Sequence, residues 1–112
     1  MGTPKVVWVI DSEQWPRALL RAELIERGFD AVGYLTVEDA LATFPRRFPD
    51  LIVIDFRDQP REDVEKLFQI GVPVIAVAGA LDAVDQPFTT VMRRPVSLGE
   101  IANKVAARLD PR

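Results

Sequence analysis

A short apolar run that ends in an acidic residue, Leu51-Ile52-Val53-Ile54-Asp55, decides the fold of this chain. A strand that is apolar at consecutive positions is covered on both faces, as strands in a parallel sheet are. Two other runs have the same character, Val6–Ile10 and Val72–Ala78, and the first of them also stops at an acid, Asp11. Weaker strand patterns lie at 31–35 and 91–92. The sequence therefore predicts five strands.

Helical patterns separate these strands. The expected helices are 16–27, 37–44, 61–70 and a last one that reaches about Leu109. Gly28 suits the end of the first helix, Thr36 caps the second, and Ser97 with Glu100 forms a capping box for the last. The stretch 81–90, which contains Pro87, is expected to be a loop or a single turn. Strands alternating with helices predict an α/β fold with a parallel sheet and right-handed crossovers.

Length and composition indicate one domain. The chain has 112 residues, of which 48% are hydrophobic and 28% charged. We expect a single folded domain over about residues 4–109, with 110–112 as a tail or the start of a linker. No apolar run is long enough to span a bilayer and no signal peptide is visible, so a cytoplasmic protein with no membrane contact is expected. The net charge of −3 argues against a nucleic-acid-binding surface.

Cysteine and histidine are both absent. This excludes disulfides, thiolate catalysis, zinc sites and histidine acid–base chemistry. A metal bound by this chain would have to be a hard ion held by oxygen, such as magnesium.

Acidic residues follow two of the strongly apolar strands. Asp11 comes after the first, with Ser12 and Glu13 next to it, and Asp55 ends the third. In such sheets ligands bind beyond the carboxyl ends of the strands, where two nearby acids repel each other and invite a cation. Each acid taken alone also fits the simpler role of a helix cap. The pairing, together with Arg94 before a proline, favours a site.

These pieces together resemble the receiver (CheY-like) domain of two-component response regulators. The matching segments are 9–13, 28–29, 49–55, 72–78 and 94–96, in this order and spacing over almost the whole chain. The resemblance implies a flavodoxin-like, doubly wound (βα)5 fold with strand order 2-1-3-4-5. It also implies shortened third and fourth helices, because fewer residues than usual separate Asp55, Ala78 and Arg94.

The resemblance assigns Asp55 as the phosphoacceptor equivalent and Asp11 as the first residue of the acid pocket. Ser12 stands where the family has a second, metal-ligating acid, and Glu13 beside it is a possible substitute. A neutral hydroxyl removes a full charge from the coordination shell of magnesium. We therefore expect Asp11 and Asp55 to bind a metal weakly, if at all.

Three further positions differ from the family or add to it. Ala78 stands at the switch position, where the family has a hydroxyl that reads the phosphoryl group. Arg94 replaces the lysine before Pro95, which is a candidate cis proline, and its planar fork is expected to pair bidentately with Asp55. Arg57 is a candidate second cation in the pocket, although alone it also fits a solvated surface charge, as does Arg93.

The sequence therefore predicts a degenerate receiver, a pseudo-receiver that is not an enzyme, needs no cofactor and acts by protein–protein interaction. Its expected partner is a histidine kinase or a downstream signalling protein, and a homodimer is possible. The alternative is a slow but functional receiver that uses Asp55 and Mg²⁺. A small flavodoxin-like enzyme or nucleotide binder is disfavoured because residues 11–17 contain no glycine.

Five apolar side chains are candidates for either the core or a partner surface. Trp8 lies within a strand run and is expected in the core, and Trp15 at the start of the first helix is expected to pack rather than to serve as a lid or anchor. Phe88, Val91 and Val96 fit either a partner surface or a seal at the sheet edge.

Overall fold

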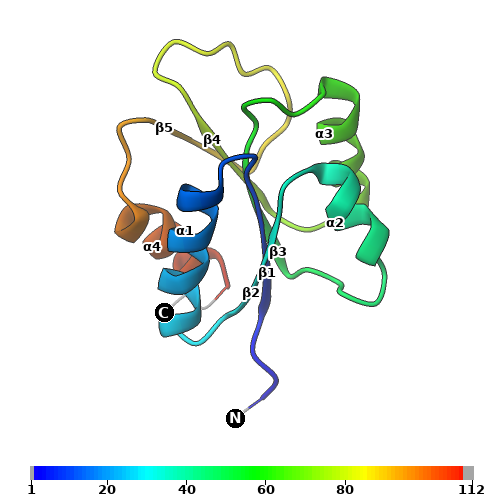
Figure 1. The fold of residues 1–112 in the computed structure, drawn as a ribbon, viewed down its shortest axis with the longest axis vertical. Coiled ribbons are helices and arrows are strands. Elements are labelled where there is room, and N and C mark those ends of the chain that lie inside the picture. Colours follow the sequence, from blue (N-terminus) through cyan, green and yellow to red (C-terminus); the bar gives the residue numbers. More distant parts are fainter. Residues whose placement is uncertain (1, 110–112) are drawn as a thin grey trace.

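The computed structural model describes residues 2–109 of the chain, so the predicted tail at 110–112 lies outside the described residues. Its centre is a five-stranded parallel sheet in the order β2-β1-β3-β4-β5 (Figure 1). The strands are β1 (Val6–Ile10), β2 (Asp30–Tyr34), β3 (Leu51–Asp55), β4 (Val74–Ala78) and β5 (Thr90–Arg93). The predicted flavodoxin-like fold and strand order are confirmed.

Helices cover both faces of the sheet. One face carries α1 (Gln14–Glu26) and α4 (Leu98–Leu109), and the other carries α2 (Val37–Thr43) and α3 (Arg61–Leu67), which continues into the 3-10 turn η1 (Phe68–Ile70) (Figure 1). The helices of the first face are 13 and 12 residues long, whereas α2 and α3 have 7 residues each. The third helix is therefore short, as predicted.

The ends of the helices follow local capping rules. The Thr36 hydroxyl accepts a hydrogen bond from the Asp39 backbone N–H at 3.0 Å. Ser97 and Glu100 form the predicted reciprocal box, with distances of 3.0 and 3.1 Å. Gly28 ends α1 with a φ of 94°, in the left-handed region that favours glycine.

The connection from β4 to β5 contains no helix. Residues 79–89 form turns, bends and irregular backbone. The shortened fourth helix implied by the resemblance is therefore absent, and the segment expected to be a loop over 81–90 is one up to the start of β5. Polar contacts hold this loop: Arg93 Nη1 donates to the carbonyl oxygens of Gly79 and Asp82, at 3.0 and 2.8 Å. The Asp82 carboxylate in turn accepts from the Gly79 N–H at 2.8 Å. Side-chain hydrogen bonds thus replace the backbone bonds of a helix.

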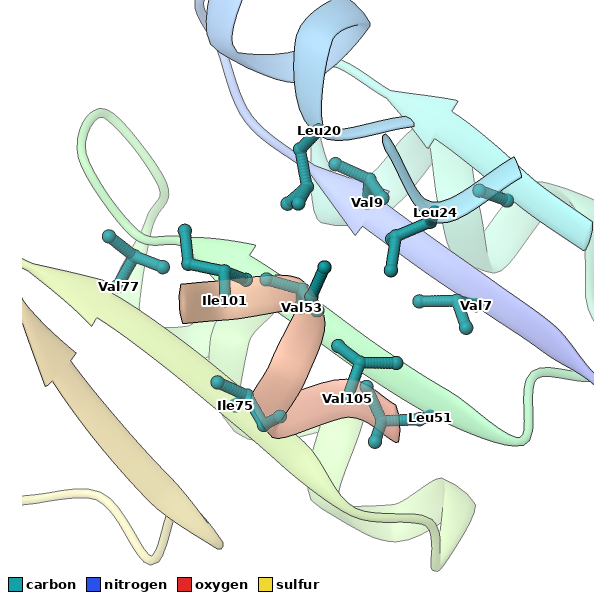
Figure 2. Packing of buried hydrophobic residues seen from close by; sticks show 12 residues of the cluster. Val7, Val9, Leu20, Leu24, Leu51, Val53, Ile75, Val77, Ile101 and Val105 are labelled. Atoms are coloured by element: carbon teal, nitrogen blue, oxygen red, sulfur yellow. The ribbon is translucent and has the colours of Figure 1, made fainter. Parts of the chain in front are cut away.

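The core has two parts, one on each face of the sheet. The part under α1 and α4 is aliphatic, and Figure 2 shows its side chains from both helices and the three central strands. The part under α2 and α3 is rich in aromatic rings: Trp8 meets Tyr34 edge-on at 5.5 Å, and Phe88 from the β4–β5 loop lies 5.8 Å from Phe56 and 5.2 Å from Phe68. Trp8 is completely buried, as predicted.

One packing prediction is wrong. Trp15 is 72% exposed, and it shares the outer face of α1 with Leu19 and Ile25, which are 51% and 49% exposed. The reason is its position on the helix. Leu20 and Leu24 point to the core, and a spacing of five residues places Trp15 about 140° away from Leu20 around the helix axis.

Candidate functional site

The carboxyl ends of the strands bring the predicted residues to one edge of the sheet. Asp55 ends β3 and is paired in register with Val77 of β4, while Ala78 is paired with Arg93 of β5. Asp11 follows β1 directly. Both aspartates are buried, with 7% of Asp11 and 6% of Asp55 exposed, and they are the buried charged residues of the described chain. Burying two carboxylates is costly unless they are paired.

Two arginines bind the Asp55 carboxylate. Oδ2 of Asp55 lies 2.6 Å from Arg94 Nη1 and 3.0 Å from Arg57 Nη2. Oδ1 accepts from the Arg57 backbone N–H at 3.1 Å. The bidentate pairing expected for Arg94 is not formed, because Oδ2 is shared between the two guanidinium groups and Oδ1 is used by the turn that follows β3. The Arg94–Pro95 peptide bond is cis, in agreement with the expectation.

The structure places Arg57 inside the acidic cluster. Besides Asp55, its guanidinium contacts Glu13 Oε1 at 2.7 Å and Asp11 Oδ1 at 3.7 Å. The simpler role of a solvated surface charge therefore does not describe it. Glu13 points to this arginine, so its carboxylate neutralises a side chain of the protein.

Asp11 is held by its own turn and by α1. Its Oδ1 accepts from the Glu13 backbone N–H at 2.9 Å, and its backbone carbonyl accepts from Arg17 Nη1 at 2.8 Å. Burial raises the pKa of the Asp11 carboxyl above its ordinary value of 3.8, and the charge of Asp55 adds to this, while the Glu13 N–H and Arg57 oppose it.

Ser12 and Ala78 take no part in this cluster. The Ser12 hydroxyl donates to Asp58 Oδ2 at 3.3 Å, and Asp58 has a positive φ of 59°. Ala78 is 1% exposed, and its carbonyl accepts from the Arg94 backbone N–H at 2.8 Å. Ala78 thus provides a backbone link to Arg94, the residue that follows β5.

The donor set does not fit magnesium. The ion prefers near-octahedral oxygen coordination with anionic ligands. Here Oδ2 of Asp55 is bound by two guanidinium groups, and Glu13 is paired with Arg57. Among residues 2–109, no three acidic side chains are arranged to hold a metal ion. Two arginine charges occupy the place where a cation would neutralise the acids.

A cavity of about 180 Å³ extends from this cluster toward the core. Four charged residues line it, Asp11, Asp55, Arg57 and Arg94, and the other nine lining residues are apolar. This cavity is not predicted from the sequence, and neither are the contacts of Arg93, which was expected to be a solvated charge. A run of residue types does not specify how completely helices fill the space above a sheet.

The fold is that of receiver domains. The chain is similar to the signal receiver domain of a putative Luxo repressor protein from Vibrio parahaemolyticus, with 18% identity, a TM-score of 0.79 and coverage of 95% of this chain and 90% of that one. A CheY-like receiver domain protein from Methanospirillum hungatei JF-1 gives 19% identity and a TM-score of 0.79, with 96% and 94% covered. A response regulator receiver protein from Burkholderia phymatum has 23% identity to this chain and a TM-score of 0.75, with 94% of each chain covered.

No family model and no curated protein matches the chain. Its likeness to receivers therefore stands on the fold, and the chemistry has to be argued from its own residues. Within the described part of the chain, no helix has the length and apolarity needed to cross a membrane.

Proposed function

We propose that this protein is a degenerate receiver, a cytoplasmic signalling module that works by protein–protein interaction without phosphorylation of Asp55. The single observation that carries the proposal is the double ion pair on Asp55 Oδ2, made by Arg94 and Arg57. A carboxylate oxygen bound by two guanidinium groups is a poor nucleophile, because its lone pairs and charge are already used.

The lost groups support the same proposal. Metal-assisted phosphoryl transfer needs a cation between the acids to neutralise developing charge. Ser12 brings no carboxylate to that place, and its hydroxyl is turned to Asp58. Ala78 has no hydroxyl to follow a phosphoryl group inward, so a modified Asp55 would lack the usual means of transmitting its state. We propose that the module needs no cofactor and is not an enzyme.

The outer face of α1 supports a protein partner. Trp15, Leu19 and Ile25 are exposed there, with Ala18 and Ala22 between them. An exposed apolar stripe of this kind is typical of a surface that another protein covers. We propose a histidine kinase or a downstream signalling protein as the partner, with a homodimer as the other possible assembly. We do not propose nucleic acid or a membrane as a binding partner.

Intact-mass measurement after incubation with acetyl phosphate and magnesium tests the proposal. We expect no phosphoryl adduct on the wild-type chain. The matched control is the variant Ser12→Asp/Arg57→Ala/Arg94→Lys, which restores an acid and a lysine and frees Asp55 of both guanidinium groups. We expect this variant to gain a measurable adduct. Stoichiometric modification of wild-type Asp55 would overturn the proposal.

The alternative is a slow receiver that uses Asp55 and Mg²⁺. It is supported by the burial of Asp11 and Asp55 side by side at the sheet edge. It predicts that millimolar magnesium changes the tryptophan fluorescence of the wild-type chain and that Asp55→Ala abolishes the change. An unchanged spectrum over the titration, with a response restored in the Ser12→Asp variant, would argue against it.

A further inference from the structure

The outer face of α1 carries exposed side chains at the spacing of a helix–helix contact. Four exposed residues follow one another at intervals of three, four and three positions: Trp15, Ala18, Ala22 and Ile25. The seam between two packed helices recurs at this spacing. At 100° per residue, the middle of this stripe points about 160° away from the mean direction of the buried Leu20 and Leu24. The stripe therefore faces away from the core that α1 covers.

The sizes of these side chains suit a second helix. Ala18 and Ala22, in the middle, let another backbone come close, whereas Trp15 and Ile25 lie at the two ends, where crossing helices diverge. Trp15 is 72% exposed and Ile25 49%, and Leu19 beside them is 51% exposed. A helix packed here removes these apolar surfaces from water, which favours association.

Two charged residues flank the stripe. At 100° per residue, Arg21 lies on one side of it and Glu26, the last residue of α1, on the other. Arg21 uses its Nε to bind the Ala31 carbonyl oxygen at 2.7 Å. Among residues 2–109, neither Arg21 nor Glu26 takes part in an ion pair. Both charges are therefore available to a helix that packs on the stripe.

The positions of the two charges make this face complementary to itself. In a parallel pair of helices, a residue on one flank meets the residue five positions later on the facing flank of the other helix. Arg21 and Glu26 are five positions apart, so a parallel second copy forms this ion pair twice. An antiparallel copy centred on the two alanines would instead place Arg21 next to Arg21 of the other copy, and like charges repel.

We propose that the outer face of α1 is a self-association surface, on which a second copy of this chain packs its own α1 in parallel about a two-fold axis. Two helices of 13 residues bury less than the roughly 1,200 Å² of a stable interface, so the dimer is weak, with a dissociation constant of roughly 10–100 μM. The signalling role of this dimer rests on the proposed function, whereas the contact depends on α1 alone. The dimer covers the stripe, so a signalling partner that binds there competes with the second copy.

Sedimentation equilibrium on the full chain tests the association. We expect the wild-type chain to pass from monomer to dimer as its concentration rises from about 5 to 500 μM. Ala22→Glu places a charge in the middle of the seam and should abolish the dimer. The matched control is Ala107→Glu, the same change at an exposed alanine of α4, which should leave it unchanged. Since both alanines are exposed, the two variants keep the core intact.

Charge reversal tests the pairing of the two copies. Arg21→Glu and Glu26→Arg each turn the two attractive contacts of the parallel dimer into repulsive ones, and we expect each to weaken it roughly three- to tenfold. Combining both changes in one chain should restore most of the affinity, because the pair is then reversed as a whole. In an antiparallel dimer, Arg21→Glu would exchange one like-charge contact for another and change nothing.

Cysteine crosslinking reports the direction of the helices, since the natural chain has no cysteine. A parallel pair places each seam residue next to its own equivalent. Ala18→Cys and Ala22→Cys should therefore each form a disulfide-linked dimer in oxidised glutathione, roughly tenfold faster than the control Ala107→Cys. In an equimolar mixture of the first two variants, intact mass should show no preference for the mixed 18–22 crosslink.

Several results would overturn the inference. They are a wild-type monomer at about 500 μM, an unchanged dimer in Ala22→Glu, no effect of the single charge reversals, equal crosslinking by Ala107→Cys, or a preferred 18–22 crosslink. The acetyl phosphate experiment is independent of these results. If Asp55 is phosphorylated while the α1 dimer forms, the proposed function fails and the dimer stands. If neither adduct nor dimer is found, the self-association inference alone fails.

Discussion

The two faces of the sheet are filled in different ways. The face under α1 and α4 has long helices, purely aliphatic buried side chains and a cavity of about 180 Å³. The face under α2 and α3 has short helices, and aromatic rings fill the space that they leave uncovered. Phe88 illustrates this best, because it comes from a loop that replaces a helix and stacks on Phe56. Large rings thus compensate for missing helix, while longer helices leave a gap next to Asp55.

The largest expected effect breaks the aromatic face. Phe88→Ala removes the contacts with Phe56 and Phe68, and we expect it to lower the free energy of unfolding by about 2–3 kcal/mol, since the ring is only partly buried. The control is Phe48→Ala, whose ring is 50% exposed and whose removal should cost less than about 1 kcal/mol. Urea titration measures both. Equal losses for the two variants would contradict the compensating role of Phe88.

The next effect concerns the charged end of the other face. Arg94→Met leaves the buried Asp55 carboxylate with Arg57 as its remaining cation, and we expect a loss of about 2 kcal/mol. Adding Asp55→Asn should recover part of this loss, because an amide needs no counter-charge. A double-mutant cycle from denaturant titrations gives the coupling. Strictly additive losses would mean that the ion pair contributes nothing to stability.

A pair of core substitutions sharpens the comparison between the faces. Val77 lines the cavity, so Val77→Ile has room for its extra carbon and should leave stability unchanged or raise it by up to about 1 kcal/mol. Ala76 is fully buried, and the alternation of β4 places it on the aromatic face. Ala76→Val should cost about 1 kcal/mol or more through overpacking. The sign of the difference in thermal midpoint decides whether the two faces are packed unequally.

The smallest expected effect comes from Asp11. Because burial raises the pKa of this carboxyl above 3.8, the folded state binds a proton more tightly than the unfolded state does, and the ionised group costs stability at neutral pH. Asp11→Asn should therefore raise the free energy of unfolding slightly at pH 7, by less than about 1 kcal/mol, as measured by urea titration. The gain should shrink as the pH falls through the raised pKa toward about 4. A gain that grows on acidification would give the opposite sign for the pKa shift.

The sequence was informative about those residues whose positions in the fold are determined by the strands. Asp11 and Asp55 lie at one edge because apolar strands end there, and a parallel sheet aligns its carboxyl ends. The contact of Arg57 with Asp55 follows from a spacing of two residues past the strand. The sharing of Asp55 Oδ2 between two arginines was not predictable in the same way. It depends on the side-chain rotamers of Arg57 and Arg94, and several carboxylates lie within reach of Arg57. The cavity was also not predictable, because it results from the distance between α1, α4 and the sheet.

For two of the wrong predictions, the packing of Trp15 and the short fourth helix, the sequence already contained a contrary signal. The spacing of Trp15 from Leu20 and Leu24 already places it on the opposite side of α1. The loop from 79 to 89 has Leu81, Val84 and Phe88 at helical spacing, but Pro87 interrupts this pattern. The proline argued for the absence of a helix rather than for a short one. Arg93 could not have been assigned to this loop from sequence, because its contacts are with backbone carbonyls.

The contrasting environments of the two tryptophans have a practical consequence. Trp8 is completely buried and donates its indole N–H to the Arg47 carbonyl, whereas Trp15 is 72% exposed. Their emission should therefore separate into a blue, quencher-resistant part and a red part that iodide suppresses. Docking on α1 would change the second part and denaturation the first, so a single unlabelled sample can report both processes in one spectrum.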